Sequence, residues 1–330
     1  MASFPCFIAR KDAAGNVTAS VEQITRDQLP PGDVLIHVHY SSLNYKDALA
    51  SQGHPGVVRT LPHVPGIDCA GTISESTSPD FQPGDTVLVT GYDLGAGQWG
   101  GLAEYVRVPA DWIVRMPPGL SPRTAMIYGT AGFTAAQCVD AIVSRRITPD
   151  RGPVVVTGAT GGVGSLAVAI LAKLGYEVHA LTGKASEHEF LRSLGAHTIL
   201  GRDALADDSD RPLLAARWTA AVDTVGGRSL VNVLRSLEHR GVAAACGLVA
   251  GTDLPLTVYP FILRGVTLAG IDSAKCPRPE RLAIWEKLAG PWNIDQLDHI
   301  AHEITLDQLP EHIQKILAGQ IVGRTLVKLA

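Results

Sequence analysis

The chain has 330 residues, of which 46% are hydrophobic and 18% charged, and its formal net charge at pH 7 is −4. This length exceeds what one hydrophobic core usually serves, so we expect two domains of ordinary folded composition. The sequence contains no long basic run and no apolar stretch of membrane-spanning length, which argues against nucleic-acid and membrane partners.

The cysteines and the N-terminus indicate the cellular compartment. Five cysteines are scattered along the chain without a C-x-x-C pair, which suits a reducing environment better than a disulfide framework or a zinc knuckle. The first residues, Met1 to Cys6, lack the basic start and the long apolar region of a signal peptide. We therefore expect a cytoplasmic protein.

Pro and Gly pairs interrupt the sequence up to about Pro122, and short strand-like runs lie between them. This texture predicts a compact, β-rich, barrel-like domain. The expected strands are residues 34–40, 71–74, 86–90 and 103–108.

From about Ser121 onward, strand-like and helix-like segments alternate. We expect helices at 130–144, 165–174, 187–194 and 229–237, and strands at 154–157, 177–181, 198–200, 220–223, 242–246 and 266–271. Ser186 and Glu189 have the spacing of a capping box for the third of these helices. The alternation predicts a parallel sheet with helices on both faces. A helix at 307–317 and a strand at 324–329 end the chain and could return to the first domain.

The strand at 154–157 runs directly into the glycine cluster of residues 158–164, and an apolar helical segment follows. Residues without Cβ let backbone N–H groups approach a pyrophosphate, which then lies at the positive end of the helix dipole. The full G-x-G-x-x-G pattern would begin at Ala159, so its first glycine is replaced, but the strand–turn–helix context is that of a dinucleotide-binding loop. The alternative is a glycine-rich turn that only packs the helix against the sheet.

The end of the second strand of this region bears on the choice of cofactor. Sites that prefer NAD place an acidic residue about twenty residues beyond the glycine loop, where it holds the ribose 2′-OH. Here the chain reads Thr182-Gly183-Lys184, with no acid at the strand end. A hydroxyl, an accessible backbone and a positive charge suit a 2′-phosphate, so we expect NADPH. The alternative is that Lys184 is a solvated surface lysine.

Four strings of sequence resemble the medium-chain dehydrogenase/reductase superfamily, namely residues 41–49, 65–71, 129–135 and 157–164. The strings 44–49, 99–104 and 323–328 are similar to one branch in particular, the zinc-free acrylyl-CoA reductase (NADPH) group, often labelled quinone oxidoreductase-like. The resemblance covers nearly the whole chain. It implies an α/β protein with a GroES-like β-rich catalytic domain, residues 1–123 and 298–330, and a Rossmann domain with a doubly wound parallel sheet, residues 124–297.

Metal-binding residues are not expected. Zinc-dependent members of the superfamily carry Gly-His-Glu where this chain has Gly66-Ile67-Asp68, so isoleucine replaces the ligand histidine. His37 and His39 share one face of a strand, but no cysteine lies near them in sequence. Without a metal to polarise an alcohol or aldehyde, reduction of a conjugated double bond fits better, because its carbonyl already activates it toward hydride.

Tyr45 and Asn44 are the catalytic candidates. A loop tyrosine beside an asparagine can donate a proton or a hydrogen bond, although a tyrosine after a strand often only packs its ring. The resemblance implies that Tyr45 lies at the cofactor. Lys46 and Asp47 are expected to form a local structural pair.

Further candidates follow from helix starts and basic residues. Thr130 opens a helix whose N–H groups would face a nicotinamide or a substrate carbonyl, or it is an ordinary cap. Arg324 could bind a cofactor phosphate or the acyl-CoA, or be a surface arginine. The basic residues Lys275, Arg278 and Arg281 could contact coenzyme A phosphates, or mark a solvated helix start. The full predicted NADPH-binding set is Tyr45, Thr130, Thr160, Gly161, Gly162, Val163, Thr182, Gly183, Lys184, Leu248, Ile262, Ser273 and Arg324.

The resemblance implies an NADPH-dependent reductase of the C=C bond of a 2-enoyl thioester, with acrylyl-CoA going to propanoyl-CoA. Two alternatives stay open: a zinc-free NADPH:quinone oxidoreductase, and a protein that binds NADPH without turnover. By analogy we expect a homodimer, formed through the edge strand near residues 266–271.

We predict that Lys184→Ala weakens the binding of NADPH far more than that of NADH. A hydrogen bond to a charged group contributes roughly 1.5–3 kcal/mol, which corresponds to about a 10–150-fold preference for NADPH. Titration of both dinucleotides into the wild-type and variant proteins measures the effect. An unchanged ratio of the two dissociation constants would contradict the 2′-phosphate assignment.

Overall fold

Three β-sheets, of two, six and seven strands, organise residues 3–330, which are the residues that the computed structural model describes. Unit 1 contains the chain up to Thr130 with Ala274–Ala289 and Leu297–Ala330, and unit 2 contains Ala131–Ser273 and Gly290–Gln296. The segment Ala274–Ala289 therefore belongs to unit 1, although the predicted domain limits assign it to the Rossmann domain. Those limits stay a prediction. Residues 1 and 2, part of the stretch compared with a signal peptide, lie outside the described residues.

The sheet of unit 2 has six strands in the order β10-β9-β8-β11-β12-β13, and every neighbouring pair is parallel. Numbered from β8, this is the order 3-2-1-4-5-6 of a Rossmann fold, and it confirms the predicted doubly wound sheet. The strands are β8 (Val154–Thr157), β9 (Val178–Leu181), β10 (Thr198–Leu200), β11 (Trp218–Asp223), β12 (Leu237–Ala245) and β13 (Thr267–Gly270).

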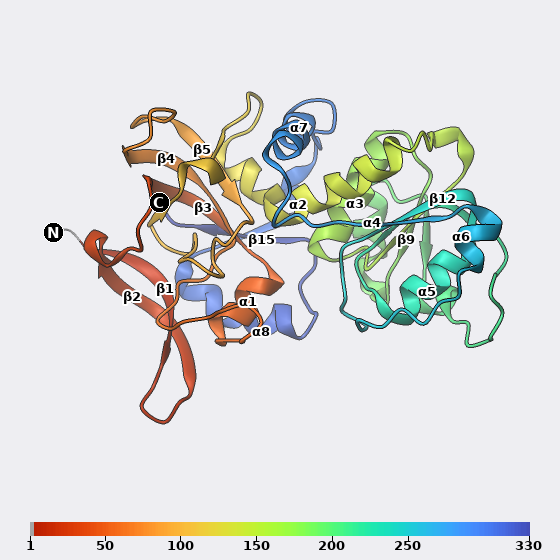
Figure 1. The fold of residues 1–330 in the computed structure, drawn as a ribbon, viewed down its shortest axis with the longest axis horizontal. Coiled ribbons are helices and arrows are strands. Elements are labelled where there is room, and N and C mark those ends of the chain that lie inside the picture. Colours follow the sequence, from red (N-terminus) through yellow and green to blue (C-terminus); the bar gives the residue numbers. More distant parts are fainter. Residues whose placement is uncertain (1–2) are drawn as a thin grey trace. The chain divides into compact units, whose positions relative to one another are not determined.

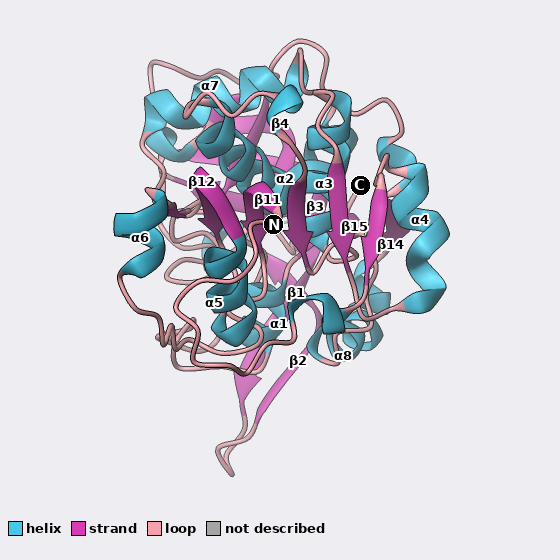
Figure 2. Ribbon diagram, turned by 90° about the vertical axis from the view of Figure 1, so that its right-hand side faces the viewer, coloured by secondary structure: helices cyan, strands magenta, loops and turns pink. Residues whose placement is uncertain are grey.

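Helices cover the sheet of unit 2 because its central strands are apolar on both faces. All four residues of β8 are buried, as expected of a strand between two helical layers. Helix α3 (Gly162–Lys173) packs on β8 and β9, and α5 (Gly227–Ser236) packs on β11 and β12; Figure 1 shows them on opposite sides of the sheet. The short helices are α4 (His188–Ser193) and α6 (Tyr259–Arg264). In Figure 2, α5 and α6 lie beside β12.

Unit 1 holds a seven-stranded sheet in which β14-β15-β3-β4-β5-β7 form the main path and β6 pairs with β3. Its strands are β3 (Val34–Leu43), β4 (Asp68–Ser76), β5 (Thr86–Thr90), β6 (Tyr105–Val108), β7 (Val114–Arg115), β14 (Ala301–Ile304) and β15 (Arg324–Lys328). A separate antiparallel pair is formed by β1 (Ser3–Lys11) and β2 (Val17–Thr25). The pairing of β15 with β3 confirms that the last strand returns to the first part of the chain.

The core of unit 1 follows the period of two expected of a half-buried strand. Val34, Ile36 and Val38 of β3 point into one buried cluster, which also contains residues of β4, β5 and β6. A second cluster joins the end of β3 to two helices, α1 (Tyr45–Ser51) and α8 (Leu309–Leu317), which lie side by side in Figure 1. This packing fixes the position of the loop between β3 and α1.

Several elements differ from the sequence-based expectation. The helices and strands that were not anticipated are β1, β2, β7, α1, α6, β14 and α7 (Arg278–Ala289). The helix expected at 130–144 is the second part of α2 (Pro122–Val143), which is broken at Gly129. The predicted capping box is wrong: Ser186 lies in a 3-10 turn before α4, and its hydroxyl donates to the neighbouring Glu187 at 3.0 Å. Among residues 3–330, no helix has the length and apolar character needed to cross a bilayer.

Candidate active site

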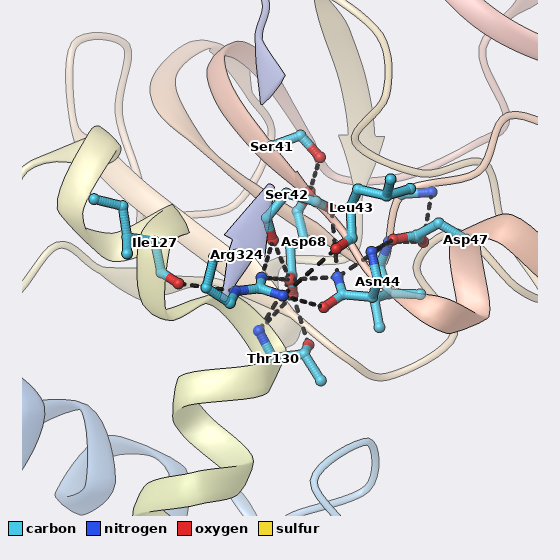
Figure 3. A network of polar contacts seen from close by, with 11 residues as sticks. Ser41, Ser42, Leu43, Asn44, Asp47, Asp68, Ile127, Thr130 and Arg324 are labelled. Atoms are coloured by element: carbon cyan, nitrogen blue, oxygen red, sulfur yellow. Dashed lines mark hydrogen bonds and ion pairs between the residues drawn. The ribbon is translucent and has the colours of Figure 1, made fainter. Parts of the chain in front are cut away.

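Four segments of unit 1 converge on one buried carboxylate, that of Asp68 (Figure 3). Asp68 is the first residue of β4, and Arg324 is the first residue of β15. Both strands run antiparallel to β3, so their first residues lie beside the last residues of β3, where Ser42 is found. Thr130 of α2 completes the group. The sheet register therefore brings together residues that are up to 282 positions apart in sequence.

Asp68 accepts hydrogen bonds from three of these neighbours. Its Oδ1 accepts from the backbone N–H and the hydroxyl of Thr130, at 3.0 and 2.6 Å. Its Oδ2 accepts from the hydroxyl of Ser42 at 2.6 Å, from Nδ2 of Asn44 at 2.8 Å and again from the Thr130 N–H at 2.9 Å. Both oxygens of this fully buried carboxylate are thus occupied by protein donors.

Arg324 supplies the balancing positive charge. Its Nη2 lies 3.8 Å from Oδ2 of Asp68 and donates to the Ser42 hydroxyl at 2.8 Å. Its Nη1 donates to Oδ1 of Asn44 at 3.1 Å, and its Nε donates to the carbonyl of Ile127 at 3.0 Å. Burial lowers the pKa of Arg324, and the carboxylates of Asp68 and Asp47 oppose that shift. Arg324 is only 3% exposed, so it is not a surface arginine.

Gly129 is required by this packing. Its φ of 51° interrupts α2, and a Cβ at this position would lie 2.5 Å from Oδ2 of Asp68 and 2.7 Å from Oγ of Ser42. Any side chain here would displace the carboxylate. The break also frees the N–H of Thr130 from the preceding turn, so that Asp68 acts as the cap of the helical segment that follows.

A second buried carboxylate, that of Asp47, fixes the start of α1. Its Oδ2 accepts from the backbone N–H of Asn44 at 2.7 Å, and its Oδ1 accepts from the N–H groups of Gly66 and Ile67 at 3.1 and 2.8 Å. Burial and then the charge of Asp68 raise the pKa of Asp47 to about 7, and the hydrogen bonds oppose the rise. The expected pair with Lys46 is wrong, because Asp47 is buried against backbone while Lys46 is exposed.

Tyr45 stands apart from this network. It is the first residue of α1, and its side chain is 51% exposed, whereas Asn44 beside it is buried. The hydroxyl of an exposed tyrosine on a fixed helix start can donate a hydrogen bond or a proton to a bound molecule. The amide hydrogens of Asn44, in contrast, face Ser42 O, Asp47 Oδ2 and Asp68 Oδ2. The catalytic assignment of both residues stays a prediction.

In unit 2, the glycine loop joins β8 to α3. Gly161 is the N-cap of α3 and provides no capping side chain, so the first N–H groups of the helix, including those of Gly162 and Val163, are directed outward at its positive end. Thr160 is buried directly before the cap. The loop is held in place by hydrogen bonds from Ala159 N–H to the carbonyl of Leu181 and from Gly161 N–H to that of Gly158. This geometry suits a pyrophosphate.

The end of β9 carries a positively charged pair that sequence reasoning missed in part. The guanidinium of Arg202 lies over Gly183, so close that a Cβ there would be 2.5 Å from its Nε. Lys184 is its neighbour: burial lowers the pKa of Lys184, Glu187 raises it, and the charge of Arg202 lowers it further. The Thr182 hydroxyl accepts from the Lys184 N–H at 3.0 Å, so its own hydrogen stays available to a ligand.

Arg202 follows β10, which pairs in parallel with β9. Neighbouring parallel strands end at the same edge of a sheet, so residues after β9 and after β10 meet there. The signal for Arg202 in the sequence is its place directly after the third predicted strand, which neighbours the second strand in a Rossmann sheet.

The remaining predicted residues of unit 2 are more exposed. Leu248 and Ile262 are 64% and 68% exposed, and Ser273 is half-buried after β13. Their cofactor roles stay predictions, as do those of Thr130 and Arg324 in unit 1.

The structure separates the basic residues Lys275, Arg278 and Arg281, and their contact with coenzyme A phosphates stays a prediction. Arg281 is fully buried, donates to the carbonyl of Thr90 at 2.7 Å and lies over the ring of Tyr92. Arg278, at the start of α7, donates to the carbonyls of Asp111 and Ile113. Lys275 and Arg278 both retain the exposed positions that the sequence suggested.

Within residues 3–330, one group of three potential metal ligands occurs, formed by Glu177, His179 and His197. The indole N–H of Trp218 donates to Nδ1 of His179 at 3.1 Å, so the proton of the neutral ring lies on Nε2, 3.0 Å from Glu177. A metal on Nε2 would require that proton on Nδ1, against the indole N–H. The group is therefore built as a hydrogen-bond chain.

A six-stranded Rossmann sheet with a glycine loop, together with a mostly antiparallel unit that carries a buried polar centre, defines a fold of the alcohol dehydrogenase type. Family models agree: the alcohol dehydrogenase GroES-like domain matches residues 30–118, and the zinc-binding dehydrogenase model matches residues 162–288. The chain belongs to the medium-chain dehydrogenase/reductase superfamily, in the branch of the acrylyl-CoA reductases and quinone oxidoreductase-like proteins. The predicted resemblance and fold class are confirmed.

Relatives in this branch align over nearly the whole chain. The probable acrylyl-CoA reductase AcuI of Escherichia coli is 49% identical, over 96% of this chain and 97% of the relative. The acrylyl-CoA reductase AcuI of Ruegeria pomeroyi is 46% identical, over 98% of each chain. The putative quinone oxidoreductase YhfP of Bacillus subtilis is 44% identical, over 99% of each.

Solved structures show the same fold. The YhdH oxidoreductase of Salmonella enterica, in complex with NADP, has a TM-score of 0.95 at 48% identity and covers 99% of this chain and 100% of its own. The YhfP protein of Bacillus subtilis, with NAD bound, has a TM-score of 0.97 at 44% identity, and each chain is fully covered.

We predict that Arg202→Ala weakens NADPH binding by about 10-fold or more and leaves NADH binding unchanged, because the guanidinium is one of two cations beside Gly183. Fluorescence titration with both dinucleotides measures this. Arg192→Ala is the matched control, since Arg192 is an exposed arginine paired with Glu189 on α4. Equal losses for NADPH and NADH would show that Arg202 shapes the loop rather than binding the 2′-phosphate.

Proposed function

We propose that this protein reduces the C=C bond of a 2-enoyl thioester with NADPH, and that acrylyl-CoA, converted to propanoyl-CoA, is its substrate. The observation that carries the cofactor is the pair of cations beside Gly183, namely Lys184, which follows it in sequence, and Arg202, which lies against it. The substrate class rests on the two relatives named acrylyl-CoA reductase, which align from end to end at 46–49% identity.

Bound NADPH would supply the hydride for the β-carbon of the enoyl thioester. The chain's own residues then have separate roles. The N–H groups at the start of α3 bind the pyrophosphate, and Lys184 and Arg202 bind the 2′-phosphate. Negative charge that develops on the thioester oxygen is stabilised by backbone or side-chain donors. Tyr45, exposed at the start of α1, or a solvent molecule protonates the α-carbon.

The residues around Asp68 support a reaction without a metal ion. Ile67 has no ligand atom, and its backbone N–H is used by Asp47. Both oxygens of Asp68 already accept from Thr130, Ser42 and Asn44. The carbonyl of an enoyl thioester activates its own double bond, so the proposed chemistry has no step that needs a Lewis acid.

Quinone reduction is the second candidate function, because the relative YhfP is named a putative quinone oxidoreductase and is 44% identical over the same length. A quinone needs only hydride or electron delivery at an accessible nicotinamide. A third possibility, binding of NADPH without turnover, would need no proton donor such as Tyr45.

We predict that purified protein oxidises NADPH rapidly with acrylyl-CoA and slowly with 1,4-benzoquinone. Assays with acrylyl-CoA, crotonyl-CoA and the quinone side by side measure this, and the ratio between the two thioesters reports the size of the acyl pocket. Turnover of the quinone alone would replace the proposed function by the second candidate. Tight NADPH binding without turnover of any of the three would favour the binding protein.

We also propose that the protein forms a cytoplasmic homodimer through β13. This strand is an edge of the sheet, and its sequence, Thr-Leu-Ala-Gly, carries none of the charges or prolines that protect free edges. Exposed apolar side chains lie in the segment before it, namely Leu248, Val249, Leu254, Val258, Tyr259, Ile262 and Leu263. A two-fold axis at β13 would pair the edge with itself and cover part of this surface. The five free cysteines suit a reducing cytoplasm.

We predict that Val258→Asp combined with Leu263→Asp converts a dimer to a monomer, because two charges would be buried in the interface. Sedimentation velocity measures the molecular mass. The control is Val143→Asp, at an exposed valine at the end of α2. A wild-type protein that sediments as a monomer at micromolar concentration would contradict the homodimer.

A further inference from the structure

We propose that Asp68 and Arg324 form a buried ion pair that positions Asn44, and through it Tyr45, for catalysis. Both are positioning residues, because neither charged group is free to touch substrate. This inference rests on the proposed reductase function, and it assigns Arg324 a role different from binding a cofactor phosphate.

The pair determines the orientation of the Asn44 amide. On one side, Nδ2 of Asn44 faces Oδ2 of Asp68 at 2.8 Å and Oδ2 of Asp47 at 3.3 Å. On the other side, Oδ1 of Asn44 accepts from Nη1 of Arg324 at 3.1 Å. Reversal of the amide would direct its oxygen at two carboxylates and its NH₂ at a guanidinium. Opposite charges on the two sides therefore permit one orientation only (Figure 3).

The fixed Asn44 in turn holds the backbone of Tyr45 in place. Asn44 is the N-cap of α1, with its backbone N–H on Asp47, and Tyr45 is the next residue and the first of the helix. The backbone of Tyr45 is thus fixed by a neighbour whose side chain and N–H are both held, while its own ring is exposed. A catalytic side chain accelerates a reaction most when the backbone that carries it is held in the reactive geometry.

Asp68 also fixes a second segment. It accepts from the N–H and the hydroxyl of Thr130, directly after the break at Gly129. The Ser42 hydroxyl, which donates to Asp68 and accepts from Arg324, links the two charges at 2.6 and 2.8 Å. One carboxylate therefore sets the start of α1 and the start of the helical segment at Thr130 together.

Stability alone does not account for the pair. Burying a carboxylate and a guanidinium carries a desolvation cost that their attraction often fails to exceed, so apolar side chains of similar size would serve a purely structural site as well. An apolar pair, however, has no donors or acceptors with which to orient an amide. The geometry thus assigns the charges to orientation.

The test separates the effect of the two charges on catalysis from their effect on stability. Asp68→Asn alone leaves the buried Arg324 cation without its counter-charge. The informative variant is therefore the double variant Asp68→Asn/Arg324→Gln, which removes both charges. We expect this double variant to regain a melting temperature near that of the wild type while kcat stays lowered by about 100-fold. The Kd of NADPH, measured by fluorescence, should change less than about 5-fold, because the 2′-phosphate contacts at Lys184 and Arg202 are intact.

Asp207→Asn/Arg235→Met is the matched control. Arg235 is buried and lies 3.2 Å from Asp207 in unit 2, so this variant removes an ion pair with a buried arginine that has no link to Asn44. It should lower the melting temperature and leave kcat unchanged. Recovery of kcat together with stability in Asp68→Asn/Arg324→Gln would overturn the proposal. A large rise in the NADPH Kd of Arg324→Gln with unchanged kcat would instead make Arg324 a cofactor ligand.

A readout that needs no turnover keeps the proposal separate from the proposed function. With 3-fluorotyrosine at position 45, the wild type should give one sharp ¹⁹F resonance, and Asp68→Asn/Arg324→Gln should give a broadened or divided one. An unchanged single resonance contradicts the positioning role, even if the wild type reduces neither acrylyl-CoA nor benzoquinone.

Discussion

The buried carboxylate of Asp68 is the interaction on which the polar centre of unit 1 depends. A carboxylate without solvent must be neutralised and must have its lone pairs filled, and here Arg324, Ser42, Asn44 and Thr130 do both. These partners come from three stretches of sequence, at the end of β3, in α2 and in β15, so the requirement ties these elements and β4 to one point. Position 129 requires glycine because the same groups leave no room for a Cβ there.

The chemistry of this branch is consistent with that centre. Where zinc-dependent relatives use Gly-His-Glu, this chain has Gly66-Ile67-Asp68, and its carboxylate is turned inward to an arginine and a helix start. Positive charge is still present at the site, but it is fixed in the protein frame. In the proposed reductase, Tyr45 is the exposed reactive side chain, and the N–H groups of α3 and the cations at Gly183 bind the cofactor.

Much of the fold was predictable from the sequence because its signals are local. The strand Val154–Thr157 is four apolar or β-branched residues in a row, and the strands at 86–90 and 198–200 were placed to the residue. The elements that were missed lack such signals. Helix α1 is only seven residues long, and β1 and β2 gain their stability from pairing with each other. The capping box at Ser186 failed because the chain makes a 3-10 turn there before the helix begins.

The sequence by itself determined the two kinds of unit, the glycine loop and the lysine after the second strand, because each is written in consecutive residues whose backbone preferences and side-chain types are sufficient. The tertiary structure decided which charges meet. Arg202 lies near Lys184 because β10 and β9 are parallel neighbours. Arg281 is buried over the ring of Tyr92. Arg324, for which the sequence allowed a phosphate ligand or a surface arginine, is the buried partner of Asp68 because β15 pairs with β3. Electrostatic roles depend on distance in space, and strand register, which is not local in sequence, sets that distance.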